Sequence, residues 1–447
     1  MNVGLDFGTS NSSISLFRDG RIRLFDLDPG SLNPHMLRSF IFINRAQETF
    51  VGSEAVDRYQ QVETGRPVYW ETKSMGQVQM IVGSGGSSPI VYWDDLMVRI
   101  DTAAQGRLIQ SVKTALRNPA YEGTDVFGTF YPVEQLIAVI LENLRLRCEA
   151  ATGEPVGGVV LGRPVKFSDD PEIDARAQAR IEAAAQLAGF KDIRFAYEPV
   201  AAAYVYHWET AERQAALVFD FGGGTLDLTV VELGGAAEPV VLATRGVLIG
   251  GDDLDRALLQ PLKRHFGDGA TLRNRQPVPA HIFGLLDSWQ TMVLLSRPEY
   301  RAILRDARRG SDPEAIDRLN HLVEQNLGFA LFQSVEAAKI RLSSEATAHV
   351  ELEQDGFRFK QLVTRPEFER LAARYIEQIE ADLDGVVHDS GLQPADIRAV
   401  LRTGGSAQIP AVIRLLGDKF GHDRLRPLNP FETIVGGLAI LANQPTS

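Results

Sequence analysis

The feature that most constrains the fold is a glycine-rich stretch, Leu217–Glu232, which reads LVFDFGGGTLDLTVVE. An apolar, β-prone run ends on Asp220, three glycines and Thr225 follow, and a second apolar run carries Asp227. The pattern predicts a β-hairpin with a tight glycine turn. Such a turn exposes backbone N–H groups that can bind an anion, because glycine has no side chain to cover them.

The chain opens with a degenerate copy of this stretch, Val3–Phe17, which reads VGLDFGTSNSSISLF. Aligned on Asp6 and Asp220, both copies contain Asp-Phe-Gly and continue into an apolar strand. An internal repeat constrains the fold more than a single motif does. This repeat predicts two related lobes, each of which contributes a phosphate-binding turn and a carboxylate to one cleft.

Length and charge exclude several protein classes. At 447 residues the chain exceeds what one hydrophobic core usually holds, so two or more domains are expected. The net charge of −12 argues against a nucleic-acid binder, which needs a basic surface. The single cysteine, Cys148, excludes an internal disulfide and fits a reducing compartment; it lies in a predicted helix, Glu134–Ala150, where we expect it to be buried. The sequence shows no basic, apolar N-terminal leader and no run approaching the roughly 20 apolar residues of a membrane span, so a cytoplasmic protein without membrane contact is expected.

The remaining pattern alternates strands and helices, which predicts an α/β fold. Buried strands are expected at Gly157–Val165 and Ala399–Thr403, and a long helix at Arg365–Ser390. Residues 263–349 are expected to be mostly helical, and the last helix to begin at Asn429-Pro430.

The stretch from Thr64 to Arg107 has a weak pattern with many turn formers, and no element is predicted there. It contains GSGGSSP, Gly83–Pro89, which superficially suggests a phosphate-binding loop. Because no Lys-Ser/Thr helix start follows, a surface loop is the preferred interpretation.

The two aspartates of the repeat each end a strand beside a glycine turn. Facing one cleft, Asp6 and Asp220 would hold a hydrated Mg²⁺, because Mg²⁺ keeps several waters and also needs phosphate oxygens. The donors to the β- and γ-phosphates would be Thr9, Ser10, Asn11 and Gly222–Thr225. A positioned water could then attack the γ-phosphate, since phosphoryl transfer depends mainly on positioning and charge neutralisation. The alternative is that both aspartates only cap their own turns.

Two further features are ambiguous by themselves. Lys113, in SVKTALR, lies between apolar positions but could be an ordinary solvated lysine. Gly404-Gly405-Ser406 lies between a predicted strand and a predicted helix, where it could hold a ribose or a phosphate or form an ordinary turn.

Seven segments form a series along nearly the whole chain: GLDFGTSNS (4–12), VVLGRPVKFSDD (159–170), AAQLAGFKDIRFAYEPVAAAYVY (184–206), DFGGGTLDL (220–228), LIGGDDLD (248–255), VEAAKIRLSS (335–344) and RTGGSAQIP (402–410). Together they resemble the nucleotide-binding domain of the Hsp70 chaperones, within the actin/sugar-kinase/Hsp70 ATPase superfamily. The nearest likeness is to the short, ATPase-only bacterial members of the YegD type.

The resemblance implies a two-lobed, actin-like ATPase fold of the α/β class, with duplicated ribonuclease-H-like domains and a nucleotide cleft between the lobes. Lobe I would comprise residues 1–214, with an inserted upper subdomain at about 38–122. Lobe II would comprise residues 215–447, with a mostly helical upper subdomain at about 246–349. A helix within residues 430–447 would pack back towards lobe I. No peptide-binding domain is expected, because the sequence ends where an Hsp70 would begin its linker.

The same resemblance assigns roles to single residues. The phosphate loops would be Asp6, Gly8, Thr9, Ser10 and Asn11, and Asp220, Gly222, Gly223, Gly224, Thr225 and Asp227. Mg²⁺ would lie at Asp6 and Asp220. The catalytic residues would be Lys113, Glu198, Asp220 and Thr225, with Lys73 as the alternative lysine. The rest of the ATP/ADP site would be Gly250, Gly251, Glu336, Lys339, Ser343, Gly404, Gly405 and Ser406.

The chain departs from the family pattern at the adenine end of the site. Hsp70 proteins hold adenine between two arginines, and the matching positions here are Ile340 and Gln408. Loss of guanidinium stacking would weaken or relax the recognition of the base. An aspartate expected after Asn429-Pro430 is Phe431.

The resemblance implies a Mg²⁺-dependent ATP-binding protein, related to chaperones, with slow ATPase activity that switches its conformation for an unidentified protein partner. The main alternative is a non-enzymatic scaffold that binds nucleotide weakly or not at all, motivated by the missing arginine pair. A small-molecule kinase and an actin-like filament former are lesser alternatives. No nucleic-acid or membrane partner is expected, and a monomer is slightly favoured.

Overall fold

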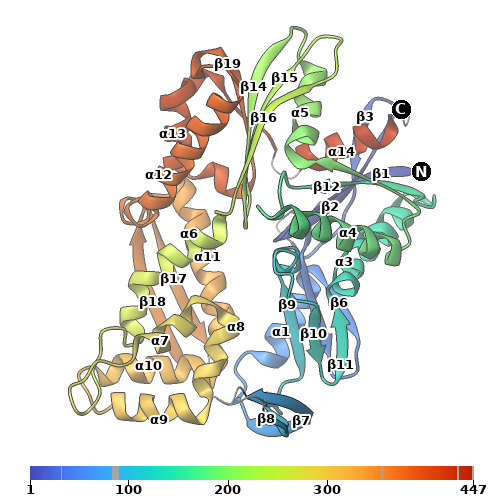
Figure 1. Ribbon diagram of the computed structural model, residues 1–447. Coiled ribbons are helices and arrows are strands. Elements are labelled where there is room, and N and C mark those ends of the chain that lie inside the picture. The colour runs from blue at the N-terminus through green and yellow to red at the C-terminus, as the bar shows by residue number, and fades with distance from the viewer. Residues whose placement is uncertain (32, 83–89, 355, 430–431, 445–447) are drawn as a thin grey trace.

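The computed structural model describes residues 1–31, 33–82, 90–354, 356–429 and 432–444. Two mixed β-sheets organise the two halves of the chain (Figure 1). The first sheet contains β1 (Asn2–Phe7), β2 (Asn11–Arg18), β3 (Arg21–Leu24), β12 (Gly158–Arg163) and β13 (Asp192–Tyr197), with β4 (Leu37–Arg38) paired to β2. The second sheet contains β14 (Gln214–Phe221), β15 (Leu226–Leu233), β16 (Val240–Val247), β19 (Ile397–Thr403) and β20 (Leu425–Pro427).

The two sheets have the same topology. The order β3-β2-β1-β12-β13 in the first corresponds to β16-β15-β14-β19-β20 in the second. In each sheet the first three strands are antiparallel, and the central strand then pairs in parallel with the fourth, which pairs in parallel with the fifth. The glycine hairpins β1–β2 and β14–β15 occupy equivalent places. The predicted α/β fold with a duplicated core is therefore confirmed.

Helices cover the outer faces of the sheets and fill the space between them. In the first half, α3 (Val133–Thr152) packs on β2 and on α4 (Pro171–Leu187); in the second, α12 (Arg365–Asp389) and α13 (Pro410–Phe420) pack on the sheet. The central layer consists of α5 (Glu198–Glu209) and α14 (Thr433–Asn443). The side chains of this layer come from both halves of the chain and form one apolar cluster.

The last helix joins the two halves through a close backbone contact. Helix α14 contacts α5, β1, β2 and β12, although it follows the second sheet in sequence. A methyl group at Gly437 would lie 1.8 Å from the carbonyl oxygen of Ala201, so only glycine allows this approach. The helix begins at Thr433, so the prediction of a start at Asn429-Pro430 was wrong by about one turn, and Pro430 lies outside the described residues.

Each half carries an outer part, and these parts lie together at the bottom of Figure 1. The outer part of the first half contains β5 (Phe40–Asn44), β6 (Thr49–Val51), α1 (Gly52–Glu63), β7 (Trp70–Val82), β8 (Ile90–Asp101), β9 (Gly106–Gln110), α2 (Val112–Ala115), β10 (Gly123–Val126) and β11 (Thr129–Pro132). The long hairpin β7–β8 was missed, because its strands lack a clean alternation of apolar and polar residues. The loop predicted at Gly83–Pro89 lies outside the described residues.

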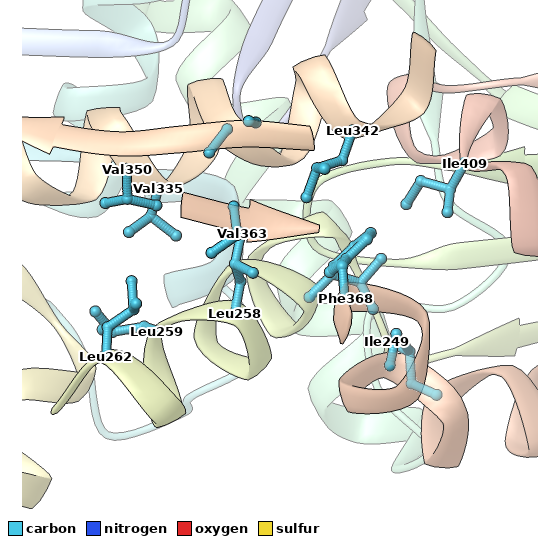
Figure 2. Packing of buried hydrophobic residues seen from close by; sticks show 14 of the residues in the cluster. Ile249, Leu258, Leu259, Leu262, Val335, Leu342, Val350, Val363, Phe368 and Ile409 are labelled. Atoms are coloured by element: carbon cyan, nitrogen blue, oxygen red, sulfur yellow. The ribbon is translucent and has the colours of Figure 1, made fainter. Parts of the chain in front are cut away.

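The outer part of the second half is mostly helical, as predicted. It contains α6 (Gly251–Leu259), α7 (Ala280–Gly284), α8 (Trp289–Met292), α9 (Pro298–Ala307), α10 (Pro313–Glu324), α11 (Gly328–Ser344), β17 (Thr347–Gln354) and β18 (Phe357–Thr364). Figure 2 shows Val335 and Leu342 of α11 packing with Val350, Val363 and Leu258. This core continues to the second sheet and fixes α6 and α11 relative to the glycine hairpin.

Two further expectations concern Cys148 and membrane-spanning helices. Cys148 is buried in α3, as expected. Among the described residues, none of the helices combines the length and the apolar character that a bilayer crossing requires.

The close contact between α14 and α5 makes a prediction about stability. Gly437→Ala should lower the free energy of unfolding by about 1–3 kcal/mol, because the added methyl group forces the two helices apart. Denaturant unfolding measures this. The matched control is Gly284→Ala in α7, where an added methyl group meets no atom within 4 Å. Equal stabilities for the two variants would contradict the argument.

Candidate functional site

The glycine turns of the two sheets face each other. The turn between β14 and β15 is closed by a hydrogen bond from Gly222 N–H to the carbonyl of Thr225, at 2.9 Å. A methyl group at Gly223 would lie 2.6 Å from Ser10 Oγ, and one at Gly224 would lie 3.3 Å from Thr9 Oγ1. The hairpin predicted from the sequence is confirmed, and its backbone meets the turn of the first hairpin across the two halves.

Four carboxylates lie beneath these turns. Asp220 and Asp227 are directly opposite each other in β14 and β15, so their side chains share one face of the sheet. They are 8% and 2% exposed. Glu198, the first residue of α5, is 7% exposed, and its side chain lies over the backbone of Gly162 in β12. Asp6 of β1 is the fourth, and its electrostatic neighbours are Glu198 and Lys113.

One lysine enters this acidic cluster. Lys113 of α2 donates a hydrogen bond from Nζ to Oε1 of Glu198 at 2.8 Å, and both side chains are largely buried. The other candidate, Lys73, is exposed on β7. The structure therefore brings Lys113 to the carboxylates and not Lys73, while the catalytic role of Lys113 stays a prediction.

The cluster perturbs the ionisation of its members. Burial raises the pKa of Asp6 to about 7, and the charge of Glu198 adds to this while Lys113 opposes it. Burial and Glu198 likewise raise the pKa of Asp227 to about 7, and that of Asp220 well above its ordinary value. Burial acts to lower the pKa of the Lys113 ammonium, but Glu198 and Asp6 outweigh it, so the pKa is raised.

The donor set fits a hydrated divalent cation. None of the hydrogen bonds among the described residues ends on the carboxylates of Asp6 or Asp220. Two buried hydroxyls also lack partners in the described part of the chain: Ser13 Oγ, opposite Asp6, and Thr403 Oγ1, beside Asp220. Within the described ranges no three His, Cys, Asp or Glu side chains form a metal cage by themselves. Two aspartates that rely on water and phosphate oxygens suit Mg²⁺, and the assignment of Mg²⁺ to them stays a prediction.

A second group of predicted residues meets beside the β14–β15 turn. Lys339 of α11 donates from Nζ to Asp255 Oδ2 at 2.7 Å and to the Gly251 carbonyl at 3.1 Å. Ser406 Oγ donates to the Gly222 carbonyl at 3.2 Å. A methyl group at Gly251 would lie 2.7 Å from Ser406 Oγ, so these residues converge on one point.

The remaining predicted residues border the same groups. Gly250 precedes α6, and a methyl group on it would lie 2.0 Å from the Gly223 carbonyl oxygen. Gly404 adopts φ +83° and Gly405 follows it. Glu336 and Ser343 flank Lys339 by one turn of α11 on either side. The backbones of Gly8 and Asn11 close the first turn, since a methyl group at Gly8 would lie 2.1 Å from the Asn11 carbonyl oxygen.

The sequence did not reveal a contact between the two outer parts. The ring centroid of Tyr59 in α1 lies 5.7 Å from that of Trp289 in α8 and 5.3 Å from that of Phe329 in α11. Asn326 Nδ2 donates to the Glu63 carbonyl at 2.9 Å, and Trp70 Nε1 donates to Ser296 Oγ at 2.7 Å. We call these residues, with Arg99, Arg297 and Glu299, the cross-cleft contact.

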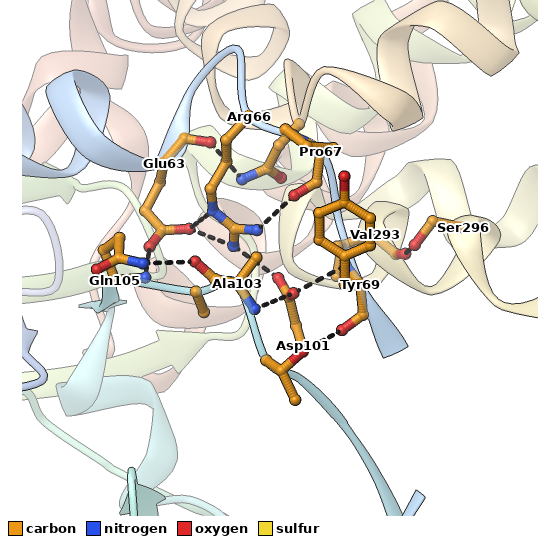
Figure 3. A network of polar contacts seen from close by, with 12 residues as sticks. Glu63, Arg66, Pro67, Tyr69, Asp101, Ala103, Gln105, Val293 and Ser296 are labelled. Carbon is orange, nitrogen blue, oxygen red and sulfur yellow. Dashed lines mark hydrogen bonds and ion pairs between the residues drawn. The ribbon is translucent and has the colours of Figure 1, made fainter. Parts of the chain in front are cut away.

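The first-half side of this contact is held by a buried ion network (Figure 3). Arg66 pairs with Glu63, and with Asp101 at 2.6 Å. Glu63 Oε1 also accepts a hydrogen bond from Gly106 N–H at 2.8 Å, and Asp101 Oδ1 accepts one from Tyr69 N–H at 3.1 Å. The network joins the end of α1 to the base of the β7–β8 hairpin, and so places Trp70 opposite Ser296.

Comparison with known proteins agrees with this geometry. The family model described as "Hsp70 protein" matches residues 2–277 and 317–444. The chain belongs to the Hsp70 family. The fold of this Hsp70-family chain is accordingly that of the Hsp70 nucleotide-binding domain, an actin-like ATPase fold. The segment between the matched parts, residues 278–316, contains α7, α8 and α9. Trp289, Ser296, Arg297 and Glu299 all lie within it.

Curated relatives of the Hsp70-family chain include two proteins named "Chaperone protein HscA homolog". The one from Azoarcus sp. (strain BH72) is 26% identical over 443 residues, and the one from Aromatoleum aromaticum (strain DSM 19018 / LMG 30748 / EbN1) is 28% identical over 444 residues. Each alignment covers 99% of this chain and 57% of the relative. The chain thus spans a little over half the length of these relatives.

The raised pKa values of the cluster predict how stability depends on pH. Between pH 3.8 and about 7 the unfolded chain releases the Asp227 proton and the folded protein retains it, so the free energy of unfolding falls as pH rises through this window. Asparagine cannot ionise. The stability of Asp227→Asn relative to wild type should therefore increase from pH 4 to pH 7 by on the order of a few kcal/mol, since one unit of pKa displacement corresponds to about 1.4 kcal/mol. Denaturant unfolding in EDTA measures the difference, and a constant difference across the window would contradict the prediction.

Proposed function

We propose that this chain binds ATP or ADP together with Mg²⁺ between its two halves, hydrolyses ATP slowly, and uses the bound nucleotide to change the relative position of the halves. One observation carries the proposal: two glycine turns on equivalent strands face each other above four carboxylates, three of them buried, and one lysine. Backbone N–H groups at such turns suit phosphate oxygens, and the carboxylates suit a cation bound to the same phosphates.

Different residues of the site would bind the phosphates, hold the cation and orient the attacking water. The turns at Thr9–Asn11 and Gly222–Thr225 would donate hydrogen bonds to the β- and γ-phosphates. Bound at Asp6 and Asp220, Mg²⁺ would neutralise the negative charge that carboxylates and phosphates bring together. Lys113 would add a positive charge beside the γ-phosphate, and Glu198 would orient the attacking water through its carboxylate.

The adenosine would lie between α11 and the turn at Gly404–Ser406, against Lys339. Ile340 is 61% exposed there, and Gln408 closes the short helix after Gly405. An exposed aliphatic side chain and an amide offer dispersion contacts and single hydrogen bonds, but no cation for the face of the base. We therefore propose that the phosphates and Mg²⁺ contribute more to affinity than the base does.

We place this activity in a chaperone-related switch, with lobes at residues 1–214 and 215–447 and a protein partner whose identity is open. Family membership and the names of the HscA relatives support the link to chaperones. A scaffold that binds nucleotide poorly is the second candidate, and the absent arginine pair at Ile340 and Gln408 favours it. Titration of the purified chain with ATP and ADP in Mg²⁺, together with an ATP turnover assay, separates the two, because a scaffold would bind nucleotide weakly or not at all and would not hydrolyse ATP.

Substitution of the cleft lysine tests the catalytic assignment. Lys113→Ala should lower the ATP turnover rate by about a hundredfold or more, because the positive charge beside the γ-phosphate is lost. The matched control is Lys73→Ala, which removes an exposed lysine of the same outer part and should leave turnover unchanged. The reverse pattern would identify Lys73 as the functional lysine.

A cation introduced at the proposed adenine end tests whether the phosphates and Mg²⁺ contribute more to nucleotide affinity than the base does. Ile340→Arg should tighten ATP binding severalfold, since a guanidinium over an aromatic face contributes roughly 0.5–2 kcal/mol. Inorganic triphosphate, which has no base, should bind both proteins equally. Calorimetric titration measures both ligands, with Leu362→Arg as a control that adds the same charge on β18. An equal gain for triphosphate would show a general charge effect instead.

A further inference from the structure

Arg117 is a second cation on the same side of the short helix α2 as Lys113. It follows α2 in a helical turn, in which its N–H donates a hydrogen bond to the Thr114 carbonyl at 3.2 Å. Residues four positions apart in such a turn lie near each other, so Arg117 lies beside Lys113, which reaches the carboxylate cluster. Val112 and Leu116 instead pack into the apolar core of the first half. The arginine therefore projects from the first half on the side that carries the functional lysine candidate.

The charges that act on the Arg117 guanidinium belong to the second half. They are the carboxylates of Asp227 in β15 and of Asp253 in α6. Helix α6 is joined to the β14–β15 turn, since Asp252 N–H donates to the Gly223 carbonyl at 2.9 Å. Arg117 thus lies across from two elements that border the glycine turn proposed to bind phosphate.

The Arg117 guanidinium makes no hydrogen bond and no ion pair with any of the residues that the structure describes. The two carboxylates that face it have other partners. Asp227 Oδ1 accepts a hydrogen bond from Val165 N–H at 3.3 Å. Asp253 Oδ1 pairs with Arg256 at 3.2 Å. Arg117 is half-buried, and burial lowers the pKa of its guanidinium although both carboxylates oppose this. A desolvated cation without a bound anion is costly, so this position favours an anionic ligand.

The backbone that leads into α2 is strained. Ser111, the residue before the helix, has φ +55° and ψ 36°, in the left-handed region that residues other than glycine rarely occupy. Its side chain makes no capping hydrogen bond that would offset this conformation. Backbone strain of this kind is concentrated at functional sites, where the surrounding structure holds it. Because α2 begins directly after Ser111, this conformation sets the direction in which Lys113 and Arg117 leave the chain.

We propose that Arg117 is a further catalytic residue, whose guanidinium binds the γ-phosphate and stabilises the negative charge that develops on it as ATP is hydrolysed. This inference rests on the proposed function, since it adds a residue to the same site. A guanidinium is planar and can donate to two phosphate oxygens at once, whereas the ammonium of Lys113 acts as a point charge.

The reaction in which Arg117 would act is the transfer of a phosphoryl group to water. The water oxygen forms a bond to the γ-phosphorus, while the bond from that phosphorus to the bridging oxygen breaks. ADP leaves with the electron pair of the broken bond, inorganic phosphate is formed, and one proton of the water is released to solvent. Positive groups beside the transferring phosphoryl group lower the barrier to this step. ADP has no γ-phosphate, so it would not make the contact with Arg117.

The test separates binding of the γ-phosphate from binding of the rest of the nucleotide. Arg117→Ala should lower the ATP turnover rate by about a hundredfold, and should weaken binding of ADP with aluminium fluoride, which stands in for the transferring phosphoryl group, by a similar factor. The affinity for ADP alone should stay at the wild-type value. Added guanidinium ion should restore part of the turnover of this variant, and Arg117→Lys should retain only part of the rate, because it keeps the charge without the planar fork. A phosphate-release assay and calorimetric titration measure these quantities.

The matched control is Arg107→Ala. It removes an exposed arginine of the same outer part, whose guanidinium donates to the Asp125 carbonyl at 2.8 Å, and turnover should match wild type. Unchanged turnover in Arg117→Ala, or an equal loss of affinity for ADP and for ADP with aluminium fluoride, overturns the role of Arg117 alone. If wild type neither binds nor hydrolyses ATP, the proposed function falls, and the role of Arg117 falls with it.

Discussion

An excess of buried negative charge governs the centre of this structure. Asp6, Asp220, Asp227 and Glu198 share a space that holds one ammonium group, that of Lys113. Burial raises the pKa of three of these carboxyl groups, so ionising them opposes closure of the two halves. The two halves are nevertheless joined at both ends, by α14 and α5 at one end and by the cross-cleft contact at the other. A cation with a polyphosphate would convert the repelling centre into an attractive one, which is how bound nucleotide could alter the position of the halves.

The duplicated sheets place the residues of this cluster at equivalent positions, but the residue types at those positions differ between the two halves. The two sheets place Asp6 and Asp220 at equivalent strand ends, but Ser13 lies opposite Asp6 where Asp227 lies opposite Asp220. On the other side, Thr403 lies beside Asp220, whereas the first sheet has Gly162 there and admits the side chain of Glu198. Both hydroxyls are buried without partners in the described residues. The second half therefore carries the greater negative charge, while the first half supplies the lysine and the glutamate.

Local pattern was enough to predict much of this arrangement. The glycine turns, the aspartates beside them and the alternation of strands and helices leave a strong signal, because each depends on residues within about one hairpin or helix. Lys113 and Lys73 could not be separated that way, since the choice depends on which segment reaches Glu198, 85 positions after Lys113. The contact of Tyr59 with Trp289 could not be predicted for the same reason, because the two residues are far apart in sequence. The hairpin β7–β8 was missed for another reason: within the described ranges its two strands pair only with each other, so no larger sheet imposes an alternating apolar pattern on them.

Family membership accounts for the residues beside the glycine turns better than for the cross-cleft contact. The residues proposed to bind phosphate lie in the matched parts of the chain, and the side chains that the second half contributes to the cross-cleft contact lie mainly in residues 278–316. The proposed adenine end also departs from the family pattern, at Ile340 and Gln408. A site that holds the base less firmly would lose nucleotide quickly if the cleft stood open, because each lost contact raises the dissociation rate. The contact of Trp289 with Tyr59 joins the two halves without involving Ile340 or Gln408, so the two departures from the family pattern concern different parts of the protein.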